Sequence, residues 1–266
     1  MESIEQSANT FISNIKQVDN EDKRCKLCKD SRMIAIHMIT GERKPSFDVV
    51  GLWDTDEYRM QSCTCITEQE VNKTLETSGI SLTEYKSKTF DSFKTFDGNS
   101  AKMKKVAMDF VNNKEAKGSG FYGNSGAGKT HICIAICNEL AKKGIGHRYF
   151  EYRKEMTALV GYQKYNQDEY TRVINIYKNC NVLYIDDLFK FAFNDNGGIN
   201  VSEFRIMFDI LNHRMLNNKK VIISCEFGST QLSEFDAAIG SRIIAMTKDY
   251  ACGVTGQNVR VHKIKD

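Results

Sequence analysis

The chain has 266 residues, of which 41% are hydrophobic, with a formal net charge of +3 and nine cysteines. This composition predicts a globular protein of one or two domains with an ordinary core. It excludes a membrane-spanning protein, because no apolar run approaches the ~20 residues that cross a bilayer, and the N-terminus lacks the pattern of a signal peptide. We therefore expect a soluble, cytoplasmic protein without a membrane partner, whose cysteines stay reduced.

Charge is distributed unevenly along the chain. Residues 1–88 carry 12 Lys and Arg against 15 Asp and Glu, whereas residues 89–266 carry 25 against 19. The basic C-terminal part is the better candidate for nucleic-acid binding, and the acidic N-terminal part is the better candidate for protein binding.

Residues 1–18 show the apolar periodicity of a helix. The apolar positions, spaced by three and four residues, include Ile4, Ala8, Phe11, Ile12, Ile15 and Val18. Such a face packs on its own domain more often than on a partner protein, and we favour the first interpretation.

Two short-range cysteine pairs follow. Two residues separate Cys25 from Cys28, one residue separates Cys63 from Cys65, and 34 residues lie between the pairs. Each pair can hold one side of a tetrahedral ion, so we predict a four-thiolate zinc site that couples metal binding to folding. His37 could replace one thiolate, and four unrelated thiols are the alternative.

The sequence from Thr67 to Lys88 is polar with scattered apolar positions, which predicts a helix followed by a linker. We therefore expect a small zinc-binding domain over 1–88 and a larger domain over 89–266. The larger domain begins with three phenylalanines, Phe90, Phe93 and Phe96. Core packing is the commoner use of this residue, and contact with a bound base is the alternative.

The central motif is Gly-Asn-Ser-Gly-Ala-Gly-Lys-Thr over 123–130, which fits the phosphate-binding loop G-x-x-x-x-G-K-[ST]. A short strand over 119–122 is expected to enter it, and an apolar helix to follow it. Lys129 would reach the β- and γ-phosphates, and Thr130 would offer its hydroxyl to magnesium. The backbone N–H groups that surround the phosphates would come from Gly123, Asn124, Ser125, Gly126, Ala127 and Gly128.

The helix after the loop contains Cys133 and Cys137, which we interpret as core residues because no polar side chain accompanies them. A second strand is expected over 144–150, and a helical region over 153–178. In that region tyrosines alternate with lysines and arginines. Such mixtures bind single-stranded nucleic acid in some proteins, but a solvated helix surface is the commoner case and the one we favour.

A second decisive element is the apolar strand that ends in Asp186 and Asp187. Its end can place both carboxylates beside the phosphate-binding loop. Asp186 would hold magnesium through its water shell, and Asp187 would orient and activate the attacking water.

Three further features lie toward the C-terminus. A helix over 201–216 precedes a buried strand over 220–226, whose tip at Glu226 can sense a γ-phosphate. Arg242 is either a surface charge or an arginine finger that reaches the nucleotide of a neighbouring subunit. A strand that ends at His262 is expected to close the chain.

Together these motifs resemble the DnaC/DnaI-type replicative helicase loaders, which are AAA+ ATPases of the IstB-like ATP-binding family. The resemblance covers nearly the whole chain. Its specific parts are the loop at 123–130, VLYIDD at 182–187, TFDSF at 89–93, IGSRI at 239–243 and the cysteine pairs. The cysteine module is similar to the zinc-bearing domain of loaders from Gram-positive bacteria and their phages.

The resemblance implies an α/β fold, in which an AAA+ ATPase domain uses ATP and Mg²⁺ and follows a Zn²⁺-binding, helicase-binding domain. It also implies a homo-oligomeric spiral or ring that binds single-stranded DNA and delivers a hexameric replicative helicase onto it. Arg242 then matches the finger, and Arg260 matches an arginine that senses nucleotide state. Glu226 departs from the family, which more often has asparagine there, so we expect weak hydrolysis that depends on assembly or DNA.

Two alternatives remain open. A transposition helper of the IstB type would share the ATPase, but that family generally lacks the cysteine module. A non-catalytic zinc adaptor that only binds ATP would be excluded by turnover that is lost on Asp187→Asn. A GTPase is disfavoured because the sequence contains no N-K-x-D motif.

Overall fold

A computed structural model describes residues 25–29, 31, 33–49, 57–192 and 200–254. By its internal contacts the chain divides into two compact units, Met1–Glu70 and Val71–Asp266. The helix expected over 1–18 and the strand expected to end at His262 lie outside the described residues.

The first unit contains a three-stranded antiparallel sheet in the order β2-β1-β3. Its elements are β1 (Met33–His37), β2 (Arg43–Pro45), the 3₁₀ helix η1 (Ser46–Val49) and β3 (Tyr58–Ser62). The core of this sheet is small, with Cys28, Ile34 and Cys63 as its buried members in the described residues. A core of this size buries too little apolar surface to stabilise a fold by itself.

The boundary between the units differs from the one expected near Lys88. Helix α2 (Thr64–Ser78) is followed by a second short helix, α3 (Leu82–Ser87), where a linker was expected. Leu75, Ile80 and Tyr85 are buried in the core of the second unit. These scattered apolar positions therefore mark helices that pack, and the second unit begins before the polar stretch ends.

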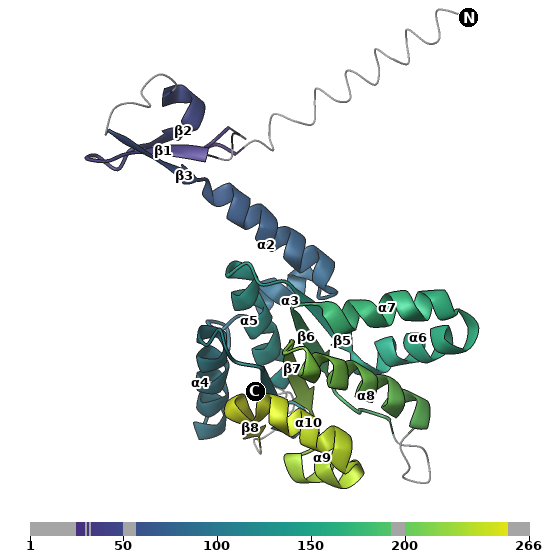
Figure 1. Cartoon of the computed structure of the whole chain (residues 1–266). Coiled ribbons are helices and arrows are strands. Elements are labelled where there is room, and N and C mark those ends of the chain that lie inside the picture. Colours follow the sequence, from purple (N-terminus) through teal and green to yellow (C-terminus); the bar gives the residue numbers. More distant parts are fainter. Residues whose placement is uncertain (1–24, 30, 32, 50–56, 193–199, 255–266) are drawn as a thin grey trace, which may run out of the picture. The chain divides into compact units, whose positions relative to one another are not determined.

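The second unit is built on a five-stranded parallel sheet in the order β5-β6-β7-β4-β8 (Figure 1). The strands are β4 (Gly118–Gly123), β5 (His147–Glu151), β6 (Val182–Asp186), β7 (Lys220–Cys225) and β8 (Ala251–Val254). The predicted α/β fold with a parallel sheet is thus confirmed. In such a sheet ligands bind at the carboxyl ends of the strands.

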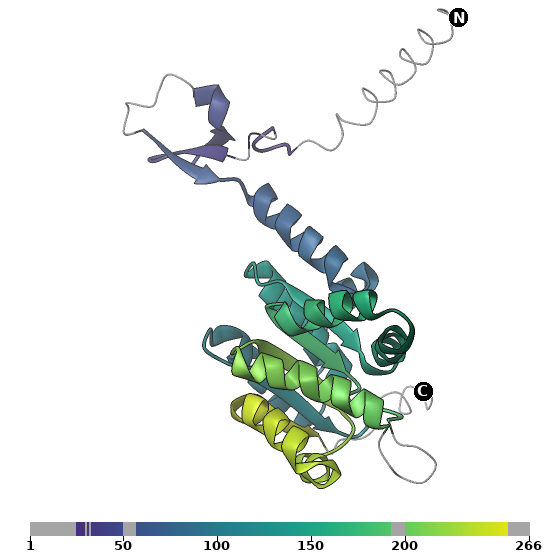
Figure 2. The same cartoon turned by 45° about the vertical axis from the view of Figure 1, so that its right-hand side comes forward.

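Helices cover both faces of this sheet. They are α4 (Gly98–Asn112), α5 (Lys129–Lys142), α6 (Tyr152–Tyr165), α7 (Gln167–Asn179), α8 (Val201–Leu216), α9 (Ser229–Phe235) and α10 (Ala237–Thr247), with the 3₁₀ helix η2 (Lys248–Tyr250). Helices α8 and α10, light green and yellow in Figure 2, lie side by side. None of the described helices is long and apolar enough to span a membrane.

Strand β6 shows why the sheet needs a layer on each side. Val182 and Tyr184 belong to the core that α3, α4 and α5 cover, whereas Leu183 and Ile185 belong to the core that α6, α7, α8 and α10 cover. Successive side chains of a strand point to opposite faces, so a strand that is apolar at every position is buried on both. The apolar run at 182–185, before Asp186, therefore has the pattern of a central strand.

The helical region expected over 153–178 is two helices. Asn166 ends α6 and caps α7, because its side chain accepts a hydrogen bond from the backbone N–H of Glu169 at 3.1 Å. An asparagine that satisfies the first N–H groups of a new helix is a common helix start. Tyr177 is buried in the core and Tyr165 is exposed, so the tyrosines do not form one surface.

Candidate functional site

The predicted phosphate-binding loop connects the end of β4 to the start of α5. Three of its glycines, at 123, 126 and 128, have positive φ angles. A Cβ atom on Gly123 would lie 2.1 Å from the carbonyl oxygen of Val254, and one on Gly128 would lie 3.0 Å from the ring of Phe93. The loop therefore favours glycine at 123 and 128 for both backbone conformation and space, and at 126 for backbone conformation.

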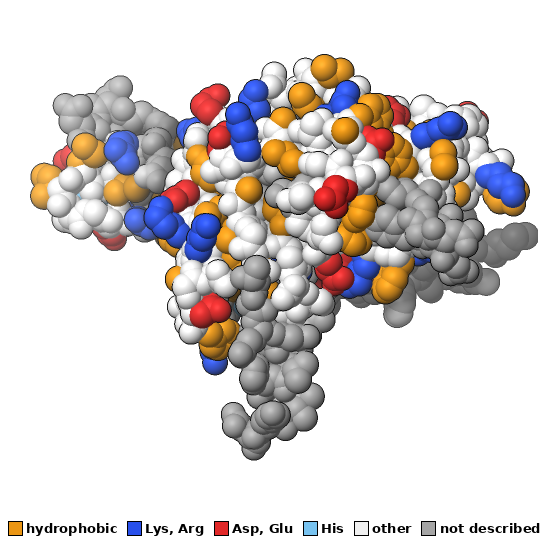
Figure 3. All heavy atoms as spheres, turned by 90° about the horizontal axis from the view of Figure 1, so that it is seen from below, with side chains coloured by type: hydrophobic (Ala, Val, Ile, Leu, Met, Phe, Trp, Pro, Cys, Tyr) orange, Lys and Arg blue, Asp and Glu red, His pale blue; other side chains and the backbone are white. Residues whose placement is uncertain are grey.

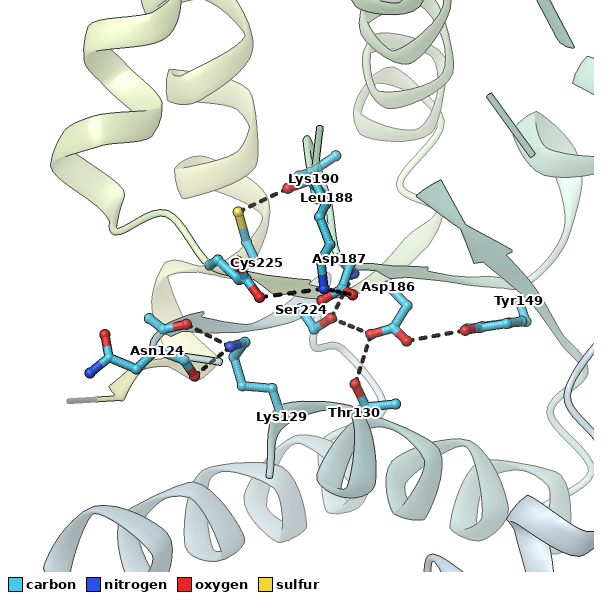
Figure 4. Close-up of polar contacts among 12 residues, drawn as sticks. Asn124, Lys129, Thr130, Tyr149, Asp186, Asp187, Leu188, Lys190, Ser224 and Cys225 are labelled. Atoms are coloured by element: carbon cyan, nitrogen blue, oxygen red, sulfur yellow. Dashed lines mark hydrogen bonds and ion pairs between the residues drawn. The ribbon is translucent and has the colours of Figure 1, made fainter. Parts of the chain in front are cut away.

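Lys129 begins α5, and its side chain turns back over the loop (Figure 4). The Nζ atom donates hydrogen bonds to the carbonyl oxygens of Gly123 at 2.5 Å and Asn124 at 2.8 Å. Burial lowers the pKa of the Lys129 ammonium, while the nearby charges of Glu226 and Asp187 act in the opposite direction. A partly desolvated ammonium at the mouth of the loop gains from an anionic ligand.

Asp186 lies at the end of β6, where hydroxyl groups from three neighbouring strands and from α5 surround its carboxylate (Figure 4). Oδ1 accepts hydrogen bonds from Tyr184 at 2.6 Å, from Thr130 at 3.2 Å and from Ser224. Oδ2 accepts one from Tyr149 at 3.1 Å. The contact between Thr130 and Asp186 brings together the two oxygen ligands predicted for magnesium, and such hard donors suit that ion.

The sequence predictions did not include the three hydroxyls of Tyr149, Tyr184 and Ser224. They meet because β5, β6 and β7 are neighbours, and the strand register pairs Tyr149 with Tyr184. These hydroxyls could have been found in the sequence as candidates because each apolar strand carries a polar residue near its carboxyl end.

Asp187 follows the strand in the left-handed backbone region, with a φ angle of 53°. Its N–H donates to the Ser224 hydroxyl at 2.9 Å, and its Oδ2 atom lies 2.8 Å from the Nζ atom of Lys190. Lys190 also lies 3.5 Å from a carboxylate oxygen of Glu226. The two predicted catalytic acids, Asp187 and Glu226, are thus joined by a lysine that the sequence predictions did not include.

A cavity of about 260 Å³ lies beside the loop. Its lining residues are Lys88, Ser125, Gly126, Gly128, Lys129, Thr130, His131, Asp187 and Lys190. Three lysines and the helix N-terminus of α5 give it the chemistry of a phosphate site. Residues of the loop, Thr130 and Asp187 line this cavity, and Asp186 is hydrogen-bonded to Thr130; their roles stay predictions.

Arg242 lies on α10 and is held by the second unit itself. Its Nε atom donates to Asn212 at 2.9 Å and its guanidinium lies over the ring of Phe208, 4.6 Å from the ring centroid. Among the described residues it does not line the loop cavity. The role of finger in a neighbouring subunit stays a prediction, and Arg260 lies outside the described residues.

The remaining sequence interpretations concern packing. Phe93 is buried and Phe90 is partly buried against the same core, whereas Phe96 is 64% exposed. Cys133 and Cys137 are fully buried among apolar residues, as expected.

The first unit brings Cys25, Cys28, Cys63 and Cys65 together, with all four sulfur atoms within 4.8 Å of one another. The Sγ atoms of Cys25 and Cys63 are 3.7 Å apart, and those of Cys28 and Cys65 are 3.4 Å apart. Sulfurs at about 2.3 Å from a tetrahedral zinc ion would be about 3.8 Å apart, so the group fits that ion.

Two observations concern the ligand chemistry of this group. Hydrogen bonding from the backbone of Cys28 lowers the pKa of the Cys25 thiol to about 7, which favours the thiolate that binds metal. The Nδ1 atom of His37 accepts backbone hydrogen bonds from Ile39 and Thr40 in the turn after β1. His37 is not a member of the four-residue group.

Comparison with known proteins gives three kinds of match. Residues 85–247 match the model of the bacterial DnaA ATPase domain. The uncharacterised protein YqaM of Bacillus subtilis is 31% identical over 224 residues, which are 79% of this chain and 68% of YqaM.

Two solved structures share the fold. The DnaI crystal structure has 24% identity and a TM-score of 0.54, covering 68% of this chain and 94% of that one. The DnaC helicase loader has 21% identity and a TM-score of 0.56, covering 64% of this chain and 98% of that one. The fold indicated by the sequence motifs is thus confirmed.

Proposed function

Because the chain belongs to the family of bacterial DnaA ATPase domains, we propose that it binds and hydrolyses ATP to load a replicative DNA helicase onto single-stranded DNA. The observation that carries the proposal is the contact between Thr130 and Asp186 at the mouth of the glycine loop. This contact joins the two halves of an ATP and magnesium site within the loader fold.

Each residue of the site has a distinct role in this proposal. Lys129 and the loop N–H groups bind the phosphates, and Thr130 with Asp186 would hold Mg²⁺, which neutralises phosphate charge when bound. Asp187 orients the attacking water and accepts its proton. The strained backbone at Asp187 fits a residue whose position is fixed by function.

Arg242 is proposed to complete the site of a neighbouring subunit when the protein assembles. Its contacts with Asn212 and Phe208 hold the guanidinium in the isolated chain. Arg242→Ala should therefore spare ATP binding by the monomer and lower hydrolysis by assemblies. If assemblies of this variant hydrolyse ATP at the rate of the parent chain, Arg242 is not an arginine finger.

The first unit is proposed to bind zinc and contact the helicase. Residues 1–70 carry 9 Lys and Arg against 13 Asp and Glu, so the unit is acidic, while the rest of the chain is basic. Among the described residues of the face in Figure 3, basic side chains are interspersed with acidic and apolar ones. We therefore propose single-stranded DNA as a partner of the second unit without assigning its contact residues.

A pull-down with the cell's replicative helicase, with and without ATP, tests the proposal directly. We expect ATP-dependent capture by the full chain, and loss of the ATP dependence in Lys129→Ala. A chain that begins at Val71 should keep ATP binding and lose the helicase. That cut is preferable to one after Lys88, because Tyr85 is part of the ATPase core. Helicase capture by the shortened chain would refute this division of roles.

The IstB-type helper and the non-catalytic adaptor give different results. The helper would associate with a transposase in place of the helicase. The non-catalytic adaptor would bind ATP without turnover, so Asp187→Asn would have no turnover to abolish.

A further inference from the structure

Lys190 is a charged residue at the phosphate cavity that the proposed mechanism leaves without a role. It follows β6 in a short segment where Asp187, Phe189 and Phe191 all have positive φ angles. Non-glycine residues adopt this conformation at an energetic cost, so a fold keeps it where the geometry is needed. Phe189 is fully buried, which fixes the segment to the core while Lys190 lines the cavity.

The ammonium of Lys190 bridges two carboxylates. Its Nζ atom is 2.8 Å from Asp187 Oδ2 and 3.5 Å from Glu226 Oε1. The hydrogen bond with Asp187 is the main reason that the pKa of Lys190 is raised. A lysine has three N–H donors, so it can keep one carboxylate partner and still donate to a phosphate oxygen.

The position of Glu226 supports a specific division of labour. Glu226 follows β7 at the strand tip where a neutral side chain was expected to sense the γ-phosphate, and a carboxylate alone would repel that group. Its pairing with Lys190 places an ammonium beside this tip, which can offset the repulsion. Lys129, in contrast, is bonded to the loop carbonyls of Gly123 and Asn124.

We propose that Lys190, held by Glu226, is the residue that distinguishes ATP from ADP. With a γ-phosphate in the cavity, Lys190 donates to that phosphate and leaves the Asp187 carboxylate available to the attacking water. With ADP, the pair between Lys190 and Asp187 persists. This inference rests on the proposed ATP site and adds a γ-phosphate ligand to it.

The test is the ratio of ATP to ADP affinity, measured by calorimetry on the full chain with magnesium. Lys190→Gln removes the charge and keeps an amide of similar reach. It should weaken ATP binding by about tenfold or more, as expected for a lost charge-assisted hydrogen bond, and change ADP binding less than about twofold. Lys190→Ala should behave in the same way, and melting curves should show that both variants fold.

Two further variants separate this role from general effects of charge. Lys142→Ala removes an exposed lysine that also pairs with an acid three residues away, and it should leave the ratio unchanged. Glu226→Gln should lower the ratio in the parent chain, where Lys190 loses a carboxylate that holds it, and should raise it in Lys190→Gln, where the carboxylate of Glu226 has lost the ammonium that offsets its repulsion.

The outcomes distinguish this inference from the proposed function. If the parent chain binds no ATP, both fail. If it prefers ATP and Lys190→Gln keeps the same ratio, or loses ATP and ADP affinity equally, the γ-phosphate role of Lys190 is wrong while the ATP site stands.

Discussion

The two units of this chain reach a defined structure by different means. The second unit places two apolar cores on opposite faces of a parallel sheet, and its binding loop is shaped by backbone and glycine. Among the described residues of the first unit, the core cluster has three buried members, two of which are cysteines of the four-sulfur group. The stability of the first unit therefore depends on the groups that form its site, whereas the second unit would fold with its site empty.

Metal removal is the strongest test of this difference. A chelator should unfold the first unit and leave the second intact, because structural zinc supplies apparent binding free energies of roughly 10–16 kcal/mol in small zinc-dependent folds. Limited proteolysis should then cleave before Val71, and elemental analysis should find one zinc per chain before treatment. A chain that contains no zinc, or a chelated chain that resists proteolysis over its first unit, would contradict the comparison.

Acid should destabilise the second unit through a buried histidine. Burial lowers the pKa of His147 from 6.5 to about 4, and its ring contacts the hydroxyl of Tyr85. The unfolded chain therefore takes up a proton first, so stability is full above pH 6.5 and falls as pH drops from 6.5 to about 4. The loss is on the order of 3 kcal/mol.

Thermal unfolding across this pH range measures that loss. The measurement is made with chelator present, so that the first unit contributes nothing. The His147→Phe variant removes the titrating ring and should have a shallower pH dependence. An equally steep dependence in the variant would assign the acid sensitivity to other groups.

Lys129→Ala should weaken ATP binding by the second unit and leave zinc binding by the first unit unchanged. Loss of the loop ammonium should lower ATP affinity about a hundredfold, equivalent to about 2.7 kcal/mol, while zinc content stays unchanged. Calorimetry and elemental analysis on the same sample provide both readings. Unchanged ATP affinity would place the nucleotide elsewhere.

The smallest expected effect is at Tyr149, whose hydroxyl donates to Asp186. Tyr149→Phe removes one of four hydroxyl donors to a carboxylate and should lower the unfolding free energy by about 1.5 kcal/mol. Thermal melts of the second unit measure this change, with Tyr165→Phe as control, because Tyr165 is 79% exposed. If Tyr149→Phe lost no stability, or no more than the control, the hydrogen bond from Tyr149 to Asp186 would not contribute to stability.

The sequence predicted the parts of the site that neighbouring residues determine. The loop over 123–130 and the acids at the end of β6 follow local patterns, and both lie at the same edge of the sheet as expected. The hydroxyls of Tyr149 and Ser224 could not be predicted, because their approach to Asp186 depends on the order of three strands.

The domain boundary and the lysine bridge were missed for related reasons. Ile80 and Tyr85 are single apolar residues in a polar stretch, and their burial depends on α5 and β5, which come later in the chain. Lys190 approaches Glu226 because β6 and β7 are adjacent and because Asp187 and Phe189 have positive φ angles. Sequence spacing carries no direct signal of either contact.

Strand β8 links the phosphate loop to the far end of the described chain. It pairs with β4, and the Val254 carbonyl accepts a hydrogen bond from the N–H of Asn124 at 3.1 Å. The end of the described chain is therefore hydrogen-bonded directly to the backbone of the phosphate-binding loop. We therefore expect fusions and purification tags placed after Val254 to alter ATP binding, which a comparison of tagged and untagged protein measures.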